Sequence, residues 1–451
     1  MMRIMIWVPF DMKLKNAFRL LVIQLALAAA SPLAAQPIAR EEVSRTVEAL
    51  NATLAENYVF PDIAAKVAAS LRSELNAGSY DALPSKEALA HALTDDLIKV
   101  SGDLHFVVGF DPVWVTQSRM KDVPSVATAK RKADHEEAAR TNFGFRGVQR
   151  LDGNIGYIDM AYFADPTLAF DTAAAAMRMV ENTDAVIIDL RYNNGGHLEM
   201  AQFIASYFFS GEKDQLLFDY YYNQDGKRIE RGQWVLSALP GKRLTDKPLY
   251  ILTSSTSFSA ADWLSYTMKK LGRARLVGAL TAGGAHPVDR KPVDNDFFLQ
   301  VPIGQIRDPV DYGDFEGTGV RPDIEVPSID ALKVAHRLAI EERAKHGVTE
   351  QDDYEWLLPK LLARNTPTAI SAAQLQSAAG KYEGRMIGIE QGKLFYMWRD
   401  RFRAALTPVA PDLFDIEGVD DFRFRVVREG DRVVGLERVN RDGSTRLYKR
   451  L

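Results

Sequence analysis

Residues 248–272 read PLYILTSSTSFSAADWLSYTMKKLG, and they predict a strand, a turn and a helix in that order. The run PLYILTS is short, apolar and β-favouring, which is typical of a strand buried on both faces. Ser259 opens the helix, where the positive end of the helix dipole and first-turn amides such as that of Ala260 can stabilise an oxyanion. Ser259 and Asp262 also fit a capping box, so a helix cap is the simpler interpretation of this serine alone.

A second stretch of the same kind lies upstream, at residues 184–209, DAVIIDLRYNNGGHLEMAQFIASYFF. An apolar strand is followed by a turn that ends in Gly195 and Gly196, and then by a helix. Ligands of open α/β sheets bind at the carboxyl ends of strands, and glycine lets the backbone approach them. A tight strand–helix turn without any ligand explains the glycines equally well. With a further strand in GNIGYIDM (residues 153–160), the alternation predicts an α/β core over residues 142–346.

The chain on either side of this core has a different character. Residues 36–112 show apolar residues at helical spacing and predict a small helical N-terminal domain. Residues 113–141 are polar and include KRKADHEEAAR, which favours a solvated helix or a linker. Residues 347–370 form a helical linker. Residues 371–451 switch to strand composition with turns between the strands, which predicts a small antiparallel β domain with an accessory role.

The amino-terminal segment and the composition limit where the protein acts and what it binds. Residues 1–35 combine a basic start, a short apolar stretch and small residues, as in a secretory signal peptide. We therefore expect export across the inner membrane to the periplasm, with no stable membrane span after cleavage. The chain has 451 residues, no cysteine and a net charge of −4, which excludes thiolate nucleophiles and argues against nucleic-acid binding.

Two further residues become candidates because of their surroundings. His105 stands in SGDLHFVV, at a junction between a turn and a strand, where a histidine is usually structural unless it acts as a general base. Glu316 lies in the glycine-flanked loop YGDFEGTG. A loop carboxylate is normally just solvated, but it can also orient a histidine.

Several motifs occur here in the order found in one family. GNIGYIDM, IIDLRYNNGG, TSSTSFSAAD, GRARLVGALTAGGA and GTGVRPDIEV together resemble the C-terminal processing (tail-specific) serine peptidases. SGDLHF is similar to the branch that includes tricorn protease and interphotoreceptor retinoid-binding protein. The resemblance covers roughly residues 40–345 and implies a crotonase-like α/β core with a helical N-terminal domain.

The resemblance also implies roles for single residues. Ser259 corresponds to the nucleophile, and the amide of Ala260 to one oxyanion donor. The second donor is a glycine amide of the NNGG turn, with Gly195 preferred to Gly196. The tricorn-like branch uses Ser, His and Glu, and its histidine and glutamate correspond to His105 and Glu316.

Two features depart from the wider family. Many members pair the serine with a lysine, but that position is Gly284 here, so a Ser/Lys mechanism is not supported. His286 lies close to it in sequence and is a lesser candidate on the substrate side. The 47 residues between His105 and Gly153 are too few for the PDZ domain that many members carry, so the core cleft itself would select the peptide.

The predicted function is therefore that of an exported serine peptidase that hydrolyses peptides or unfolded protein through an acyl-enzyme. The resemblance implies no metal ion and no cofactor. Two alternatives remain open at this stage. One is a non-catalytic periplasmic binding protein for apolar or peptide ligands on the same fold. The other is an esterase or amidase, which the same three residues would serve.

Overall fold

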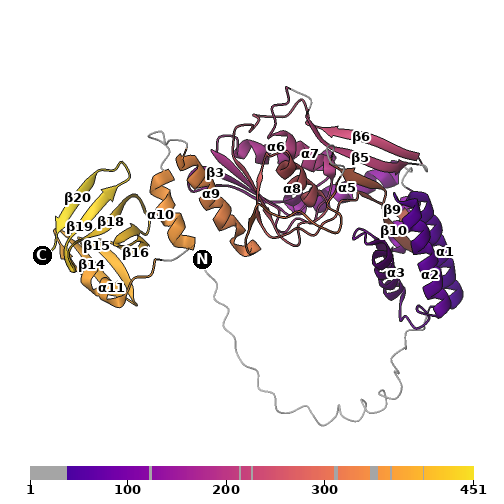
Figure 1. Ribbon diagram of the computed structural model, residues 1–451, viewed down its shortest axis with the longest axis horizontal. Coiled ribbons are helices and arrows are strands. Elements are labelled where there is room, and N and C mark those ends of the chain that lie inside the picture. The colour runs from indigo at the N-terminus through magenta and orange to yellow at the C-terminus, as the bar shows by residue number, and fades with distance from the viewer. Residues whose placement is uncertain are drawn as a thin grey trace, which may run out of the picture.

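The computed structural model describes residues 38–120, 124–212, 215–224, 227–308, 313–345, 354–365, 368–399 and 401–451. They form an elongated molecule with helices at one end, a sheet covered by helices in the middle and an antiparallel β domain at the other end (Figure 1). The predicted signal peptide, residues 1–35, lies outside the described residues. Among the helices of the described ranges, none is both long and apolar enough to cross a membrane.

The middle of the molecule is a six-stranded sheet with the order β12-β8-β7-β4-β3-β2. Its strands pair in parallel, except that β2 runs antiparallel to β3. Because β4 and β7 are parallel neighbours, the turns that follow them meet at one edge of the sheet. This topology confirms the predicted α/β core. The strands are β2 (Phe145–Leu151), β3 (Ile155–Met160), β4 (Ala185–Asp189), β7 (Leu249–Thr253), β8 (Arg275–Gly278) and β12 (Ile324–Glu325).

Helices cover both faces of this sheet, which explains the uninterrupted apolar runs of its strands. Ile188 and Ile251 face α6, α7 and α8 in one core. Ile187 and Leu252, one position away in each strand, face α9 and α10 in a second core on the other side. The covering helices are α6 (Pro166–Met179), α7 (Leu198–Ser206), α8 (Ala260–Lys270), α9 (Ala331–Lys345) and α10 (Tyr354–Asn365).

The N-terminal helices α1, α2 and α3 build a core of their own, into which a distant hairpin inserts. Strand β10 pairs with β1 and β9, and its Phe297, Leu299 and Val301 are buried among the helices. Figure 1 shows β9 and β10 beside these helices. The hairpin follows His286 directly, so this part of the chain joins the two regions. The elements are α1 (Arg40–Asn57), α2 (Pro61–Ala77), α3 (Lys86–Ser101), β1 (Val107–Phe110), β9 (Val288–Pro292) and β10 (Phe297–Pro302).

Smaller elements surround the central sheet. Helix α5 is exposed along almost its whole described length, as the polar sequence predicts for a solvated helix. A three-stranded antiparallel sheet, in the order β11-β5-β6, projects toward the N-terminal helices (Figure 1). These elements are α4 (Pro112–Arg119), α5 (Pro124–Arg140), β5 (Leu216–Gln224), β6 (Lys227–Trp234) and β11 (Gly304–Arg307).

The C-terminal region is an eight-stranded antiparallel sheet in sequential order, β13 to β20, which confirms the predicted β domain. Its core is separate from the other cores, with Phe424 fully buried in it. Arg423 lies over the ring of Trp356 in α10, at 4.1 Å from the ring centre. The elements are α11 (Ala372–Ala378), β13 (Gly380–Tyr382), β14 (Arg385–Glu390), β15 (Lys393–Trp398), β16 (Phe402–Ala410), β17 (Leu413–Ile416), β18 (Val419–Glu429), β19 (Arg432–Asn440) and β20 (Thr445–Lys449).

Candidate active site

The turns that follow β4 and β7 are fastened to each other by hydrogen bonds. The Thr256 hydroxyl donates to the carbonyl of Arg191 at 2.7 Å. The Phe258 amide donates to the carbonyl of Asn193 at 3.0 Å. The hydroxyl-rich sequence TSSTS therefore holds the residues just before Ser259 against the NNGG turn.

Ser259 has the backbone conformation of a strained position, not of a helix cap. Its φ is +58° and its ψ is −119°, a region that residues other than glycine rarely adopt. The Asp262 carboxylate accepts from the amides of Gly283 and Gly284, at 3.2 and 3.0 Å, and the Ser259 side chain makes no cap bond. The capping-box interpretation is therefore wrong. Within the described part of the chain, no hydrogen bond engages the Ser259 hydroxyl.

Gly195 packs directly on the candidate nucleophile. A Cβ atom at this position would lie 2.6 Å from Ser259 Cβ and 3.1 Å from the Ala260 nitrogen, and φ is +99°, so only glycine fits. The Gly195 amide donates to the Asn193 side chain at 2.9 Å. Among the described residues, the amides of Gly196 and Ala260 have no such acceptor. This favours Gly196 over Gly195, the reverse of the order expected from the sequence.

His105 is almost fully buried, at 4% exposure, next to the same turn. Its ring lies against that of Phe258, with 4.5 Å between the ring centres. Its Nδ1 lies 3.7 Å from Asp103 Oδ1 and 4.0 Å from Glu316 Oε2. Neither ring nitrogen has a hydrogen-bond partner among the described residues. The structure thus brings His105 and Glu316 together, with the residue before Ser259 touching the imidazole.

Sequence analysis missed Asp103, which is the centre of the buried polar cluster. It accepts from the His105 amide at 3.1 Å and from the Tyr58 hydroxyl at 3.4 Å, and it contacts His286 Nδ1 at 2.6 Å. Burial alone would raise the pKa of Asp103, but the two imidazoles and the His105 amide hold it well below its usual range. The sequence contains a pointer to Asp103, because this acidic residue stands two positions before the candidate base His105 in SGDLHF.

The Glu316 carboxylate is held by backbone amides of two other segments of the chain. Its Oε2 accepts from the Ala285 amide at 2.5 Å, and its Oε1 from the Leu104 amide at 3.4 Å. Burial raises the pKa of Glu316, and the nearby Asp103 charge raises it further, against the opposing effect of His286. Glu316 is therefore not a solvated loop carboxylate.

His286, expected as a lesser candidate on the substrate side, lies among the carboxylates. It is 6% exposed, and its Nδ1 is 3.6 Å from Glu316 Oε2 in addition to its contact with Asp103. Burial disfavours the charged ring, but Asp103 and Glu316 raise the pKa of His286 above its ordinary value. Two histidines and two carboxylates thus form one buried cluster.

The lysines near the site in sequence have other partners. Lys269 pairs with Asp323 at 3.0 Å, and Lys291 pairs with Asp289 at 2.7 Å. At Gly284, the position where the resemblance would place a lysine, a Cβ atom would lie 2.6 Å from His105 Cε1. The space of a lysine side chain is thus taken by the imidazole.

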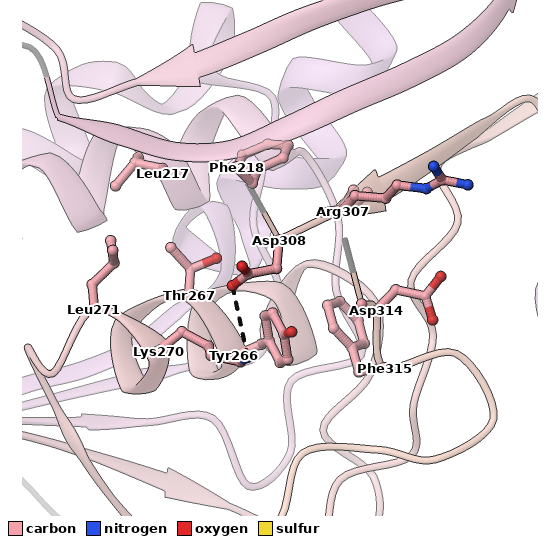
Figure 2. A pocket seen from close by; sticks show the side chains of 12 residues that line it. Leu217, Phe218, Tyr266, Thr267, Lys270, Leu271, Arg307, Asp308, Asp314 and Phe315 are labelled. Carbon is pink, nitrogen blue, oxygen red and sulfur yellow. Dashed lines mark ion pairs between the residues drawn. The ribbon is translucent and has the colours of Figure 1, made fainter. Parts of the chain in front are cut away.

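A pocket along the later turns of α8 lies at the opposite end of the helix from Ser259 (Figure 2). Phe218 and Phe315 contribute to its wall, and the pocket has a volume of about 200 Å³. Lys270 Nζ pairs with Asp308 Oδ2 across it at 3.9 Å. This pocket is therefore distinct from the candidate active site.

The arrangement contains the parts that acyl transfer needs. A strained serine lies at a helix start next to the glycine turn, two nearby backbone amides have no acceptor among the described residues, and a buried histidine has carboxylates on its Nδ1 side. The titratable groups of the cluster are buried, and His105 packs on Phe258, the residue before this serine, as is typical of an active site.

Comparisons with known proteins identify the family to which the two main regions of the chain are similar. Residues 154–326 match peptidase family S41, and residues 24–145 match the N-terminal domain of peptidase S41 in eukaryotic IRBP. A carboxyl-terminal-processing protease of Picosynechococcus sp. is 26% identical over 173 residues, which are 38% of this chain and 39% of that protein. The chloroplastic carboxyl-terminal-processing peptidase 3 of Arabidopsis thaliana is 26% identical over 181 residues, 39% of this chain and 33% of that protein.

The matched region thus spans less than half the length of these curated relatives. A lipoprotein from Streptococcus agalactiae is similar in structure with a TM-score of 0.44 at 14% identity, covering 66% of this chain and 96% of that one.

Proposed function

Because the chain belongs to peptidase family S41, we propose that it is a serine peptidase that cleaves peptides or unfolded protein through Ser259, His105 and Glu316. The observation that carries this proposal is the packing of Gly195 on Ser259. It brings a strained serine and the Ala260 amide against the glycine turn, and His105 packs on Phe258, the residue before this serine.

In the proposed reaction, His105 takes the proton of the Ser259 hydroxyl as the oxygen attacks the scissile carbonyl. The amides of Ala260 and Gly196 stabilise the oxyanion that forms. His105 then gives its proton to the leaving amine, and the acyl-enzyme remains. Water repeats the sequence on the ester and releases the second product.

Glu316 and Asp103 have different parts in this scheme. Both lie on the Nδ1 side of His105, where a carboxylate holds the ring with its proton on Nδ1 and stabilises the imidazolium. Asp103 is already engaged by His286, Tyr58 and the His105 amide. We therefore assign the direct partnership to Glu316 and the positioning of the loop to Asp103.

The hydrogen bond between Ser259 and His105 forms when substrate closes the site. Catalytic hydrogen bonds are often long in free enzymes and shorten in the complex. Here the imidazole is already held by Phe258, whose own amide is fixed to the NNGG turn.

We further propose that residues 1–35 direct the protein to the periplasm, where its substrates are exported peptides or protein tails. Secretory signal peptides have the pattern of charge and apolar residues seen in this segment. Fractionation of cells that express the chain, with and without residues 1–35, tests this proposal. Recovery of the intact chain in the cytoplasm would contradict it.

Labelling by a fluorophosphonate probe tests the nucleophile. We expect the wild-type chain to be labelled, and Ser259→Ala and His105→Ala to lose the label. Ser255→Ala, an exposed serine in the same turn, is the matched control and keeps it. Folding of each variant is checked by circular dichroism.

Turnover of peptide and ester substrates by wild-type enzyme that has not been treated with the probe then separates a peptidase from an esterase. Faster cleavage of peptides supports the proposal. Hydrolysis of esters alone would favour the esterase alternative. A folded wild-type chain that takes no label would favour a binding protein instead.

A further inference from the structure

The buried cluster holds more ligating groups than a Ser-His-Glu site needs. We infer that Asp103, His105 and Glu316 form a site for a divalent zinc ion, and that zinc bound there inhibits the enzyme. One nitrogen and two carboxylate oxygens, one from each residue, lie within 4.8 Å of one another. The binding of zinc stands independently of the proposed function, whereas its inhibitory effect depends on it.

The separations of these atoms suit a small ion. Zinc binds histidine nitrogen at about 2.0–2.1 Å and carboxylate oxygen at about 2.0–2.2 Å, so tetrahedral ligands lie roughly 3.3–3.5 Å apart. His105 Nδ1 is now 3.7 Å from Asp103 Oδ1 and 4.0 Å from Glu316 Oε2. All three atoms lie within 4.8 Å of one another, so side-chain shifts of about 0.7 Å or less per atom would bring them into range.

The second observation that points to a ligand is the state of His105. The residue is 4% exposed, yet neither of its ring nitrogens has a partner among the described residues. A buried polar atom without a partner is costly, and this one faces two carboxylate oxygens. An ion between Nδ1 and those oxygens would give the ring nitrogen a partner.

The surroundings hold the oxygens in place. His286 contacts the other oxygen of Asp103, and the amides of Ala285 and Leu104 bind Glu316. Such partners around the ligands fix ligand orientation and strengthen metal binding. Glu316 is the most exposed of the three ligands, at 13% for its side chain, and exposed Leu104 lies beside it, so the ion enters from this side.

Zinc at Nδ1 would stop the proposed reaction by fixing the proton on His105. The ion takes the lone pair of Nδ1, so the single proton of the neutral ring stays on Nε2. A protonated Nε2 cannot accept the proton of the Ser259 hydroxyl, and the general base is lost without any blockage of the cleft. Removal of the ion restores the base, so the inhibition is reversible.

Calorimetric titration of the full, untagged chain with zinc chloride tests the site, with cobalt(II) absorption as a second readout. We expect one zinc per chain in the wild type and in Ser259→Ala. Asp103→Asn and Glu316→Gln should weaken binding by about 100-fold, and Glu325→Gln, an exposed carboxylate, should leave it unchanged. His286→Gln should weaken it by about 10-fold or more.

Inhibition of peptide cleavage should show the same midpoint as zinc binding and reverse with a chelator. Absence of stoichiometric binding in the wild type would overturn the site, as would binding that neither Asp103→Asn nor Glu316→Gln affects while both remain folded. Ser259→Ala measures zinc binding independently of catalysis. A wild-type chain that binds zinc but cleaves no peptide would refute the proposed function and leave the metal site standing.

Discussion

Gly284 lies directly against His105: a Cβ atom on residue 284 would stand 2.6 Å from His105 Cε1 and 2.3 Å from Phe258 Cε2. Residue 284 is thus part of the wall of the histidine pocket. A lysine at this position and a histidine at residue 105 exclude each other in space.

The first prediction follows from this contact. Gly284→Ala should displace the imidazole, because the φ of Gly284 permits a side chain but its surroundings do not. Overpacking of this kind costs about 1–3 kcal/mol of unfolding free energy. A misplaced base should lower kcat by roughly 10²-fold.

Steady-state kinetics and chemical denaturation measure the two effects. Gly147→Ala is the matched control, since a Cβ atom there meets only the Gln149 side chain, at 3.7 Å. Full activity in a folded Gly284→Ala chain would contradict the assignment of His105 as the base.

The second prediction concerns Asn193, which holds the glycine turn from within. Its side chain accepts from the Gly195 amide at 2.9 Å and donates to the Met160 carbonyl at 3.2 Å, and it is fully buried. Asn193→Ala leaves both groups unpaired, so we expect a loss of about 1–3 kcal/mol in stability. A shifted turn should also lower kcat by roughly 10²-fold, with a smaller change in KM.

Asn193→Asp separates the two bonds, because it keeps the acceptor for Gly195 and loses the donor to Met160. Its activity should lie between those of the wild type and Asn193→Ala. If Asn193→Ala retains the kcat of the wild type, the turn does not supply an oxyanion donor.

The sequence predicts what local pattern controls and misses what distant packing controls. The apolar runs before Ser259 and before the NNGG turn indicate two parallel strands, and neighbouring parallel strands bring their following turns together. No local pattern shows that Asp103 and His286, 183 residues apart, contact each other at 2.6 Å. That contact depends on the β9–β10 hairpin, which crosses from the central sheet into the core of the N-terminal helices.

The third prediction concerns the pH dependence of stability. The pKa of Asp103 is lower in the folded chain than in the unfolded chain. Asp103 therefore stabilises the fold at pH values above its unfolded pKa of about 3.9, and this stabilisation is lost as the pH falls below that value. The folded pKa values of His286 and Glu316 are raised. These two residues therefore stabilise the fold at low pH. Their stabilisation is lost as the pH rises above their unfolded pKa values, which are about 4.3 for Glu316 and about 6.5 for His286.

Thermal unfolding between pH 3 and pH 9 should therefore show a maximum at mildly acidic pH and a decline above neutrality. His286→Gln removes a group that titrates above about pH 6.5, so the decline should be shallower in this variant. Asp103→Asn should instead remove the loss of stability on the acidic side. A Tm of His286→Gln that runs parallel to that of the wild type at every pH would rule out this account.

The last prediction concerns the C-terminal β domain. Its core is separate, and the proposed active-site residues all precede it. A chain that ends at Asn365 should therefore keep the kcat/KM of the full chain toward short peptides. Its thermal unfolding should lack the transition that belongs to the β domain.

Removal of the β domain also removes the contact of Arg423 with Trp356 in α10, which should lower the stability of the remaining chain. Loss of a cation–π contact of this kind costs about 0.5–2 kcal/mol, so the truncated chain should unfold at a slightly lower temperature. Trp356→Phe in the full chain, with weaker cation–π attraction, is the control for this effect. Loss of peptide cleavage in a truncated chain that remains folded would mean that the β domain takes part in substrate binding rather than serving as an independent accessory.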